Sequence, residues 1–504
     1  MIFESPVVNR LTKNYSFDAA CMHSNQKNIF YFLMFSYAVL VLFNLAFIPI
    51  AWIDEIMDLD PAMRFVEGHG YNSNLWSYKG SEKLFLANLP LRNMPFVVMG
   101  YLFGADIFWI RLPHVLFFLG ACFFLFKLLK FYSNETVAWI VLLFFVFDKG
   151  IYESLRAVRC EMQELLYISA SLYFTFIKKR IFLSVLLSGL LAIVHPATWV
   201  ISGLIALKNI FAVKKFQSKI LAIVLYLLPT MIWLYVIKLD FQGVVTQLFA
   251  AGMDHTEIAQ GLNILGAHFY KRFNIYFSSQ PWVWLGVLVA HLIALRNLIR
   301  EKDYLSFIFI SHSLFWLFLL APNYRYNPSL LLFSYLLIAK EIARIKWQFS
   351  WAKVLVGVLL ITQMLPFAAI NIMGILQREE RNPYQVQQWL SQQVSLKGRT
   401  LLCGESIGLY WLHSRIDKSG KLNFCAPNYP HKFDFSKYDQ IVLFTSEDIA
   451  LSPFAEYVIP IKFPQITSLL SKSGSPTYNG MKLYNVSPEQ LTEYCLKIRH
   501  GDPW

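Results

Sequence analysis

Charge is scarce in this chain. Asp, Glu, Lys and Arg make up only 15% of the 504 residues, whereas hydrophobic residues make up 56% and the mean hydropathy is +0.45. A typical soluble domain carries about 25% charged residues, so the composition excludes an ordinary soluble protein. It predicts a polytopic membrane protein.

Several common motifs are also missing. The six cysteines are scattered and form no CxxC pair, which argues against a metal or redox site of that kind. We find no phosphate loop, no nucleophile elbow and no internal repeat. The first apolar run is too long for a cleavable signal peptide. The net charge of +13 sits mostly in short loops between apolar runs, so we expect no nucleic-acid partner.

Apolar runs recur along most of the chain. A bilayer-spanning helix needs about 20 residues, and hydropathy predicts an all-α bundle of about eleven spans. The expected spans are 29–52, 111–130, 136–147, 161–177, 181–194, 197–210, 220–237, 282–295, 304–320, 329–342 and 354–375.

Basic residues indicate the orientation of this bundle. If residues 1–28 are cytoplasmic, every cytoplasmic turn is short and basic, as the positive-inside bias requires. These turns contain Lys127/Lys130, Lys178-Lys179-Arg180, Lys208/Lys214/Lys215/Lys219, Arg296/Arg300/Lys302 and Lys340/Arg344/Lys346/Lys353. Residues 29–376 then form the membrane domain, with a long outer loop at 53–110, and residues 377–504 lie outside.

The outer segments have patterns of their own. In the first loop, the short apolar stretch Pro95–Phe103 and the amphipathic Met57–Val66 are expected in the membrane interface. Residues 377–504 read as a small α/β module. Strands are expected at 400–403, 440–444 and 457–461, and helices at 383–393 and 466–472. A hairpin turn is expected at Asn479-Gly480.

This topology places a set of polar residues on the outer side. Asp54-Glu55 end the first span, Arg159 and Glu161 enter the fourth, His195 lies in an outer turn, and Arg325 precedes the tenth span. Each has a simpler interpretation: a solvated helix end, a structural ion pair, a helix cap or a lipid-headgroup contact. Taken together, carboxylates suit a general base and guanidinium groups suit a phosphate. Transfer of a sugar from a lipid-linked phosphate needs both, because the leaving group gains negative charge.

The order of these motifs resembles the GT-C membrane glycosyltransferases, and in particular the protein O-mannosyltransferase and lipid A aminoarabinose-transferase branch. The resemblance covers about residues 29–375. The motifs that carry it are Asp54-Glu55, Glu67–Gly70, Pro90 to Pro95, Phe103-Gly104, Arg111-Leu112-Pro113, Arg159-Cys160-Glu161, Gly189–Pro196 and Arg325-Tyr326 before Pro328.

The resemblance implies roles for individual residues. The catalytic base falls on Asp54, with Glu55 beside it, and a second acid falls near Glu161. Arg159, His195 and Arg325 would hold and neutralise the departing polyprenyl phosphate. The Lys-Pro-Pro of many relatives is replaced here by Leu91–Pro95, so we expect Lys79, Lys83 or Arg92 to take over its phosphate contacts.

The resemblance also implies partners. The donor would be a polyprenyl-phosphate-linked sugar, and the acceptor a hydroxyl or amine of a lipid, glycan or protein at the outer face of a bacterial inner membrane. Some relatives use a divalent cation at the acidic site and others do not, so a cation held by Asp54 stays open. The alternative function is a lipid-linked glycan polymerase, a flippase or another membrane protein that transfers no sugar.

Overall fold

The computed structural model describes residues 24–501, apart from 51–52, 74, 77–78, 157, 239, 256–280, 320–327, 345–349, 395–397, 405–421, 426–433 and 459–476. Within these residues, one helix corresponds to each expected span. These helices are α2 (Ser24–Phe43), α5 (Ile107–Tyr132), α6 (Glu135–Val146), α8 (Glu161–Phe176), α9 (Ile181–Ala192), α10 (Trp199–Ala212), α11 (Phe216–Val236), α14 (Pro281–Glu301), α15 (Tyr304–Leu319), α16 (Pro328–Ile342) and α17 (Ser350–Leu376).

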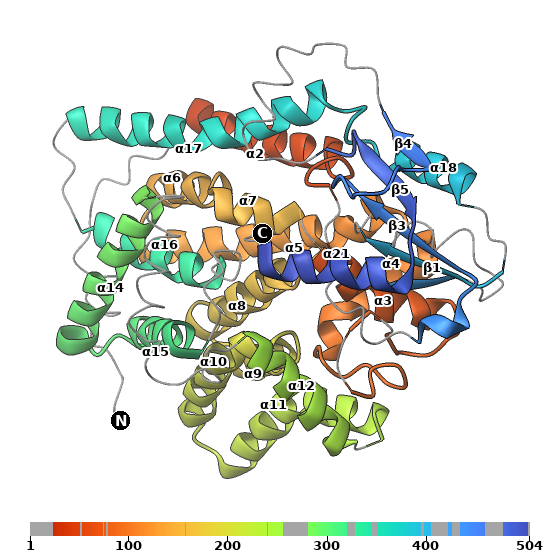
Figure 1. Ribbon diagram of the computed structural model, residues 1–504. Coiled ribbons are helices and arrows are strands. Elements are labelled where there is room, and N and C mark those ends of the chain that lie inside the picture. The colour runs from red at the N-terminus through yellow and green to blue at the C-terminus, as the bar shows by residue number, and fades with distance from the viewer. Residues whose placement is uncertain are drawn as a thin grey trace.

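The helices form one bundle. Figure 1 shows α2 and α17 together along one side, α9 to α11 along the opposite side, and α5, α8 and α16 between them. Among the described helices, α5, α11, α14 and α17 are long and apolar enough to cross a membrane by length and composition. The apolar parts of α2, α6, α9, α10 and α15 are shorter. Membrane helices are therefore present, and the number of spans remains a prediction.

Shorter helices connect the bundle. They are α3 (Ile53–Val66) and α4 (Pro90–Phe103) in the first outer loop, α7 (Lys149–Arg156) before α8, the 3-10 turn η1 (Pro196–Thr198) before α10, and α12 (Phe241–His255) after α11.

The basic turns gather at one end of the bundle. Lys208 of α10 lies over the rings of Phe176 and Tyr304, 5.3 and 4.4 Å from their centroids, so α8, α10 and α15 meet there. Lys340 of α16 pairs with Asp303 at 3.1 Å. Further ion pairs at this end include Lys27–Glu135, Lys130–Glu135, Arg344–Glu301 and Arg344–Glu341. The chain thus returns its cationic turns to one surface, as the charge pattern predicts.

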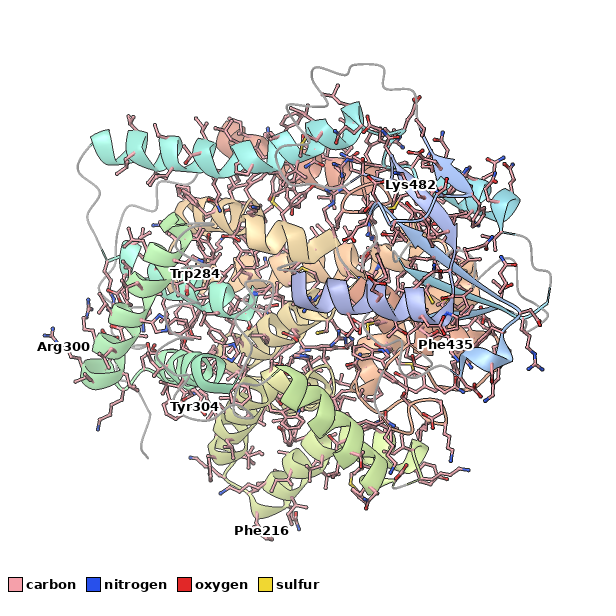
Figure 2. All side chains as sticks on the ribbon, viewed as in Figure 1. Phe216, Trp284, Arg300, Tyr304, Phe435 and Lys482 are labelled. Carbon is pink, nitrogen blue, oxygen red and sulfur yellow. The ribbon has the colours of Figure 1, made fainter. Side chains whose placement is uncertain are left out.

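The opposite end collects the outer segments. Arg156 of α7 donates to the Asn44 carbonyl after α2 at 2.8 Å. Gln247 of α12 donates to the Leu84 carbonyl at 2.8 Å and accepts from the Leu86 amide at 2.7 Å, which clamps the segment after α11 onto the first loop. Figure 2 places Arg300, at the end of α14, on the far side of the view from Phe435 and Lys482 of the C-terminal module.

The first helix is shorter than expected. Hydropathy predicts a span from 29 to 52, but α2 ends at Phe43. The buried Asn44 side chain donates to Asn371 Oδ1 of α17 at 3.0 Å, and Pro49 follows, which has no amide to continue a helix. The helix therefore ends at an interhelical hydrogen bond and a proline, although the apolar composition alone predicts that it continues.

The C-terminal module is a five-stranded sheet in the order β2-β1-β3-β5-β4. Strands β1, β2 and β3 are parallel, and β5 runs antiparallel to β3 and β4. Its elements are α18 (Pro383–Gln393), β1 (Thr400–Gly404), β2 (Leu422–Cys425), η6 (Phe435–Lys437), β3 (Gln440–Thr445), β4 (Ala455–Tyr457), β5 (Met481–Asn485) and α21 (Pro488–Gly501).

Both faces of the sheet are covered. Alternation along the strands sends Leu402 and Phe444 into a core with α18 and with Met57 of α3, and Cys403 and Leu443 into a second core with α21. Tyr384 of α18 also donates to Asp106 Oδ1, the oxygen that caps α5, at 3.2 Å. The module therefore packs directly on the outer end of the bundle.

Two details of the outer segments differ from expectation. The stretch 57–66 was expected in the membrane interface, but most of α3 is buried beneath the sheet; α4, in contrast, exposes Tyr101 and Leu102. The turn at Asn479-Gly480 forms, with φ +81° at Gly480, but β5 pairs with β4 rather than with residues 477–478. The expected helix at 466–472 lies outside the described residues, as does most of the expected strand at 457–461, and β2 was not foreseen.

Gly189 provides a test of the packing between α9 and α11. A Cβ there would lie 2.3 Å from the Tyr226 carbonyl oxygen, whereas at Gly203 of α10 the nearest atom is the Tyr226 hydroxyl at 4.0 Å. We expect Gly189→Ala to destabilise the protein by about 1–3 kcal/mol through overpacking. Gly203→Ala serves as the control. Thermal unfolding in detergent measures both, and equal Tm values for the two variants would contradict this packing.

Candidate active site

A buried ion pair anchors the end of the bundle that carries the sheet module. Glu55 of α3 and Arg111 of α5 are both almost fully buried. Arg111 Nη2 donates to Glu55 Oε2 at 2.7 Å and Nε donates to Oε1 at 3.1 Å, the fork geometry of a strong pair. Arg111 Nη1 also donates to the carbonyls of Leu45 and Pro49, each at 2.9 Å. One guanidinium therefore joins the end of α2, the start of α3 and the start of α5.

Glu55 also reaches the segment before α8. Its Oε1 accepts from the Val158 amide at 2.7 Å. Next to it, His114 of α5 meets the Arg159 backbone, and the Arg159 amide donates to His114 Nε2 at 3.0 Å. These bonds place residues 158 and 159 against the first turns of α3 and α5. The backbone of Asp54 lies in the first turn of α3. Its side chain lies outside the described part of the structure.

Arg159 and Glu161 form a second buried pair. Arg159 Nε donates to Glu161 Oε1 at 2.8 Å. Glu161 lies in the first turn of α8, where a carboxylate is favoured by the helix dipole. Within the described part of the chain, Glu161 Oε2 is buried and has no hydrogen-bond partner. A buried carboxylate oxygen is costly in that state, so this oxygen is a candidate contact for a bound acceptor, water or ion.

A third buried group contains Asp58 and Arg92. Arg92 of α4 pairs with Asp58 of α3 through both Nε and Nη2, and Asn88 donates to the other Asp58 oxygen at 2.8 Å. Burial disfavours the charge of Arg92, but the Asp58 carboxylate outweighs it and raises the pKa of Arg92 above its ordinary value. Arg92 is within electrostatic range of Arg159 and Cys160, so the three groups are neighbours.

His195 reaches the same region from another helix pair. It precedes η1, and its Nδ1 lies 3.5 Å from Glu164 Oε1 of α8 and accepts from the Ala197 amide at 3.3 Å. Cys160, just before α8, donates to the same Glu164 oxygen at 3.3 Å. Burial raises the pKa of the Cys160 thiol well above its ordinary value, in keeping with its role as donor.

The structure therefore brings together Glu55, Arg92, Arg159, Glu161 and His195 at the end of the bundle that carries the sheet module. Lys79 and Lys83 are exposed on the first loop. Arg325 lies outside the described residues. Sequence reasoning missed Arg111, Asp58, Cys160 and Glu164 as members of the cluster. A signal existed for Glu164, because it stands one helical turn after Cys160.

The comparisons with known proteins identify the fold. The structure resembles that of ArnT from Cupriavidus metallidurans, solved with bound undecaprenyl phosphate, with a TM-score of 0.53 at 11% identity over 90% of this chain and 97% of that one. The apo form gives a TM-score of 0.52 at 12% identity, over 91% and 98% of the two chains. The chain has the GT-C fold.

Other comparisons add less. An Archaeoglobus fulgidus oligosaccharyltransferase, crystallised with zinc and sulfate, gives a TM-score of 0.45 at 10% identity over 82% of this chain and 67% of that one. Neither a protein-family model nor a curated protein sequence matches the chain. The similarity of the structures thus confirms the expected fold. The sequence identity to these proteins is too low to assign roles to individual residues.

The acidic pair is a poor cation site. Both oxygens of Glu55 are taken by Arg111, and Oε1 also accepts from Val158, so Glu55 presents a neutralised carboxylate. A cation needs oxygen ligands whose charge is not already balanced. Of the two adjacent acids, this leaves only Asp54 as a ligand.

The Glu55–Arg111 pair can be tested by removing one or both partners. Arg111→Met leaves the Glu55 carboxylate buried without its cation, which typically costs about 3–5 kcal/mol. The double variant Glu55→Gln, Arg111→Met removes the unbalanced charge, so we expect it to recover part of this loss. Thermal unfolding in detergent measures both. With Glu55→Gln measured as the second single variant, a double variant as unstable as the sum of the two single variants would contradict a direct coupling.

Proposed function

We propose that the chain is an inverting glycosyltransferase that moves a hexosyl or pentosyl group from a polyprenyl-phosphate sugar to an acceptor hydroxyl or amine. The observation that carries this proposal is the buried, arginine-rich cluster at one end of a GT-C fold. ArnT, which shares the fold, binds undecaprenyl phosphate. A transporter would place its ionisable groups near the middle of the bundle, whereas these residues lie at helix ends.

Asp54 is assigned the role of general base. It accepts the acceptor's proton as the acceptor atom attacks the anomeric carbon, and the sugar–phosphate bond breaks with its electrons leaving on the polyprenyl phosphate. Arg111 bonds both oxygens of Glu55, so the role of Glu55 is to position the start of α3. Glu161, whose Oε2 has no hydrogen-bond partner among the described residues, orients the acceptor.

Positively charged side chains stabilise the leaving phosphate. Arg159 and Arg92 belong to the cluster, and each has a carboxylate that holds its guanidinium in place. A fixed guanidinium needs little reorganisation when negative charge develops on the phosphate. We keep His195 and Arg325 in this set. Lys79 and Lys83 are exposed, which suits a first electrostatic contact with the donor headgroup rather than stabilisation of the transition state.

We place this site at the outer face of a bacterial inner membrane. The basic end of the bundle would face the cytoplasm, with residues 1–28, and the eleven helices would all span. The sheet module, on the cluster's end, would lie outside and help to choose a lipid, glycan or protein acceptor.

Replacing Asp54 tests the chemistry. We expect Asp54→Asn to lower sugar transfer by about 100-fold or more, because the base is lost, while donor binding remains. Transfer from a labelled polyprenyl-phosphate sugar in membranes is the measurement, with Tm in detergent as the folding control. Glu67→Gln, in the exposed loop after α3, should retain full transfer. Full activity in folded Asp54→Asn would refute the assignment.

Single cysteines test the orientation in intact cells. Lys437→Cys in η6 and Arg300→Cys at the end of α14 are both at exposed positions. We expect a membrane-impermeant maleimide to label the first from outside and the second only after lysis. Labelling of position 300 in intact cells would reverse the topology and remove the outer-face site.

A further inference from the structure

Cys160, Glu164 and His195 form a group that the proposed reaction does not use as a unit. Their ligand atoms, Sγ, a carboxylate oxygen and a ring nitrogen, all lie within 4.8 Å of one another. It is the only such group of three or more metal-ligating side chains found among the described residues. Cys160 and Glu164 are buried and His195 is half-buried.

Two of the three spacings between these atoms match a tetrahedral metal site. Zinc binds sulfur at about 2.3 Å and nitrogen or oxygen at about 2.0–2.2 Å, so neighbouring ligand atoms in a tetrahedron lie about 3.3–3.8 Å apart. The Cys160 Sγ–Glu164 Oε1 distance is 3.3 Å and the His195 Nδ1–Glu164 Oε1 distance is 3.5 Å. The present contacts thus need only small shifts to admit an ion.

The backbone explains why these ligands meet. Cys160 precedes α8 and Glu164 stands four residues later, so both side chains project from the same face of its first turn. His195 is held in an extended conformation between α9 and η1, with Pro196 fixing the next residue. Two ligands come from one helix end and the third from a rigid turn of the helix pair beside it.

The arginines near Glu164 are paired with other carboxylates. Two arginines lie within electrostatic range of Glu164, but Arg92 is paired with Asp58 and Arg159 with Glu161. Each of these two arginines therefore already pairs with a carboxylate other than Glu164. A thiolate, an imidazole and a carboxylate are a ligand set that zinc accepts and that magnesium and calcium do not favour.

We propose that Cys160, Glu164 and His195 bind a zinc ion. The ion replaces the Cys160 thiol proton, which passes to solvent, and displaces the 3.3 Å contact between the Ala197 amide and His195 Nδ1. Three protein ligands leave a fourth position for water or an anionic oxygen. The site does not depend on the proposed function. If the sugar transfer is also correct, the zinc ion supplies the positive charge at this position, with His195 neutral as its ligand.

Metal analysis of the intact protein tests this site. The full chain is purified on a tag without histidine, and its zinc content is measured by mass spectrometry of the metal. We expect about one zinc ion per chain, and almost none in Cys160→Ser and His195→Ala. Cys122→Ser is the matched control, because Cys122 is buried within α5 and belongs to no group of metal ligands among the described residues. It should keep its zinc.

Cobalt substitution keeps the test decisive if a variant folds poorly. The wild-type chain loaded with Co²⁺ should show a thiolate-to-cobalt charge-transfer band in the near ultraviolet, and Cys122→Ser should show the same band. Absence of both stoichiometric zinc and this band in the wild type would overturn the proposal, as would a band that Cys160→Ser retains. Neither readout uses sugar transfer, so an inactive enzyme with bound zinc would refute only the proposed function.

Discussion

The buried pair of Glu55 and Arg111 is the interaction on which the end of the bundle beneath the sheet module depends. Arg111 satisfies both oxygens of Glu55 and two carbonyls after α2, while Glu55 also holds the Val158 amide. In a site of low dielectric, neither charge is tolerable alone, and together they are held by at least five hydrogen bonds. The result is a fixed junction of α2, α3, α5 and the segment before α8. All the other buried groups of the cluster are arranged around it.

Charge balance organises the rest of the cluster in the same way. Arg92 has Asp58, Arg159 has Glu161, and Glu164 lies between Cys160 and His195. Since each arginine has its own acid, the region can hold several guanidinium groups close together without strong mutual repulsion. Such an arrangement suits a ligand that brings further negative charge, because the donors are already oriented before it binds.

Much of the fold could be predicted because a helix in contact with lipid needs a long, continuous run of apolar residues in the sequence. The apolar runs gave one helix each, and the basic turns predicted that one end of the bundle would be cationic. The end of α2 could not be predicted, because Asn44 bonds to Asn371, 327 residues away. Arg111 was part of a recognised motif, but its partner Glu55 lies on another helix and nothing local links them. Likewise, His195 and Glu164 meet only because α8 and α9 pack together.

The position of the cluster along the chain has a consequence for biosynthesis. Its described members, from Glu55 to His195, all belong to the first two-fifths of the sequence, and the helices that carry them are complete once α10 has emerged. The charged side chains can therefore neutralise one another in the membrane while the ribosome is still translating α14 to α17. Later helices then pack around a junction that is already paired. With this order of synthesis, the buried charges need not stay unpaired until the whole chain has been made.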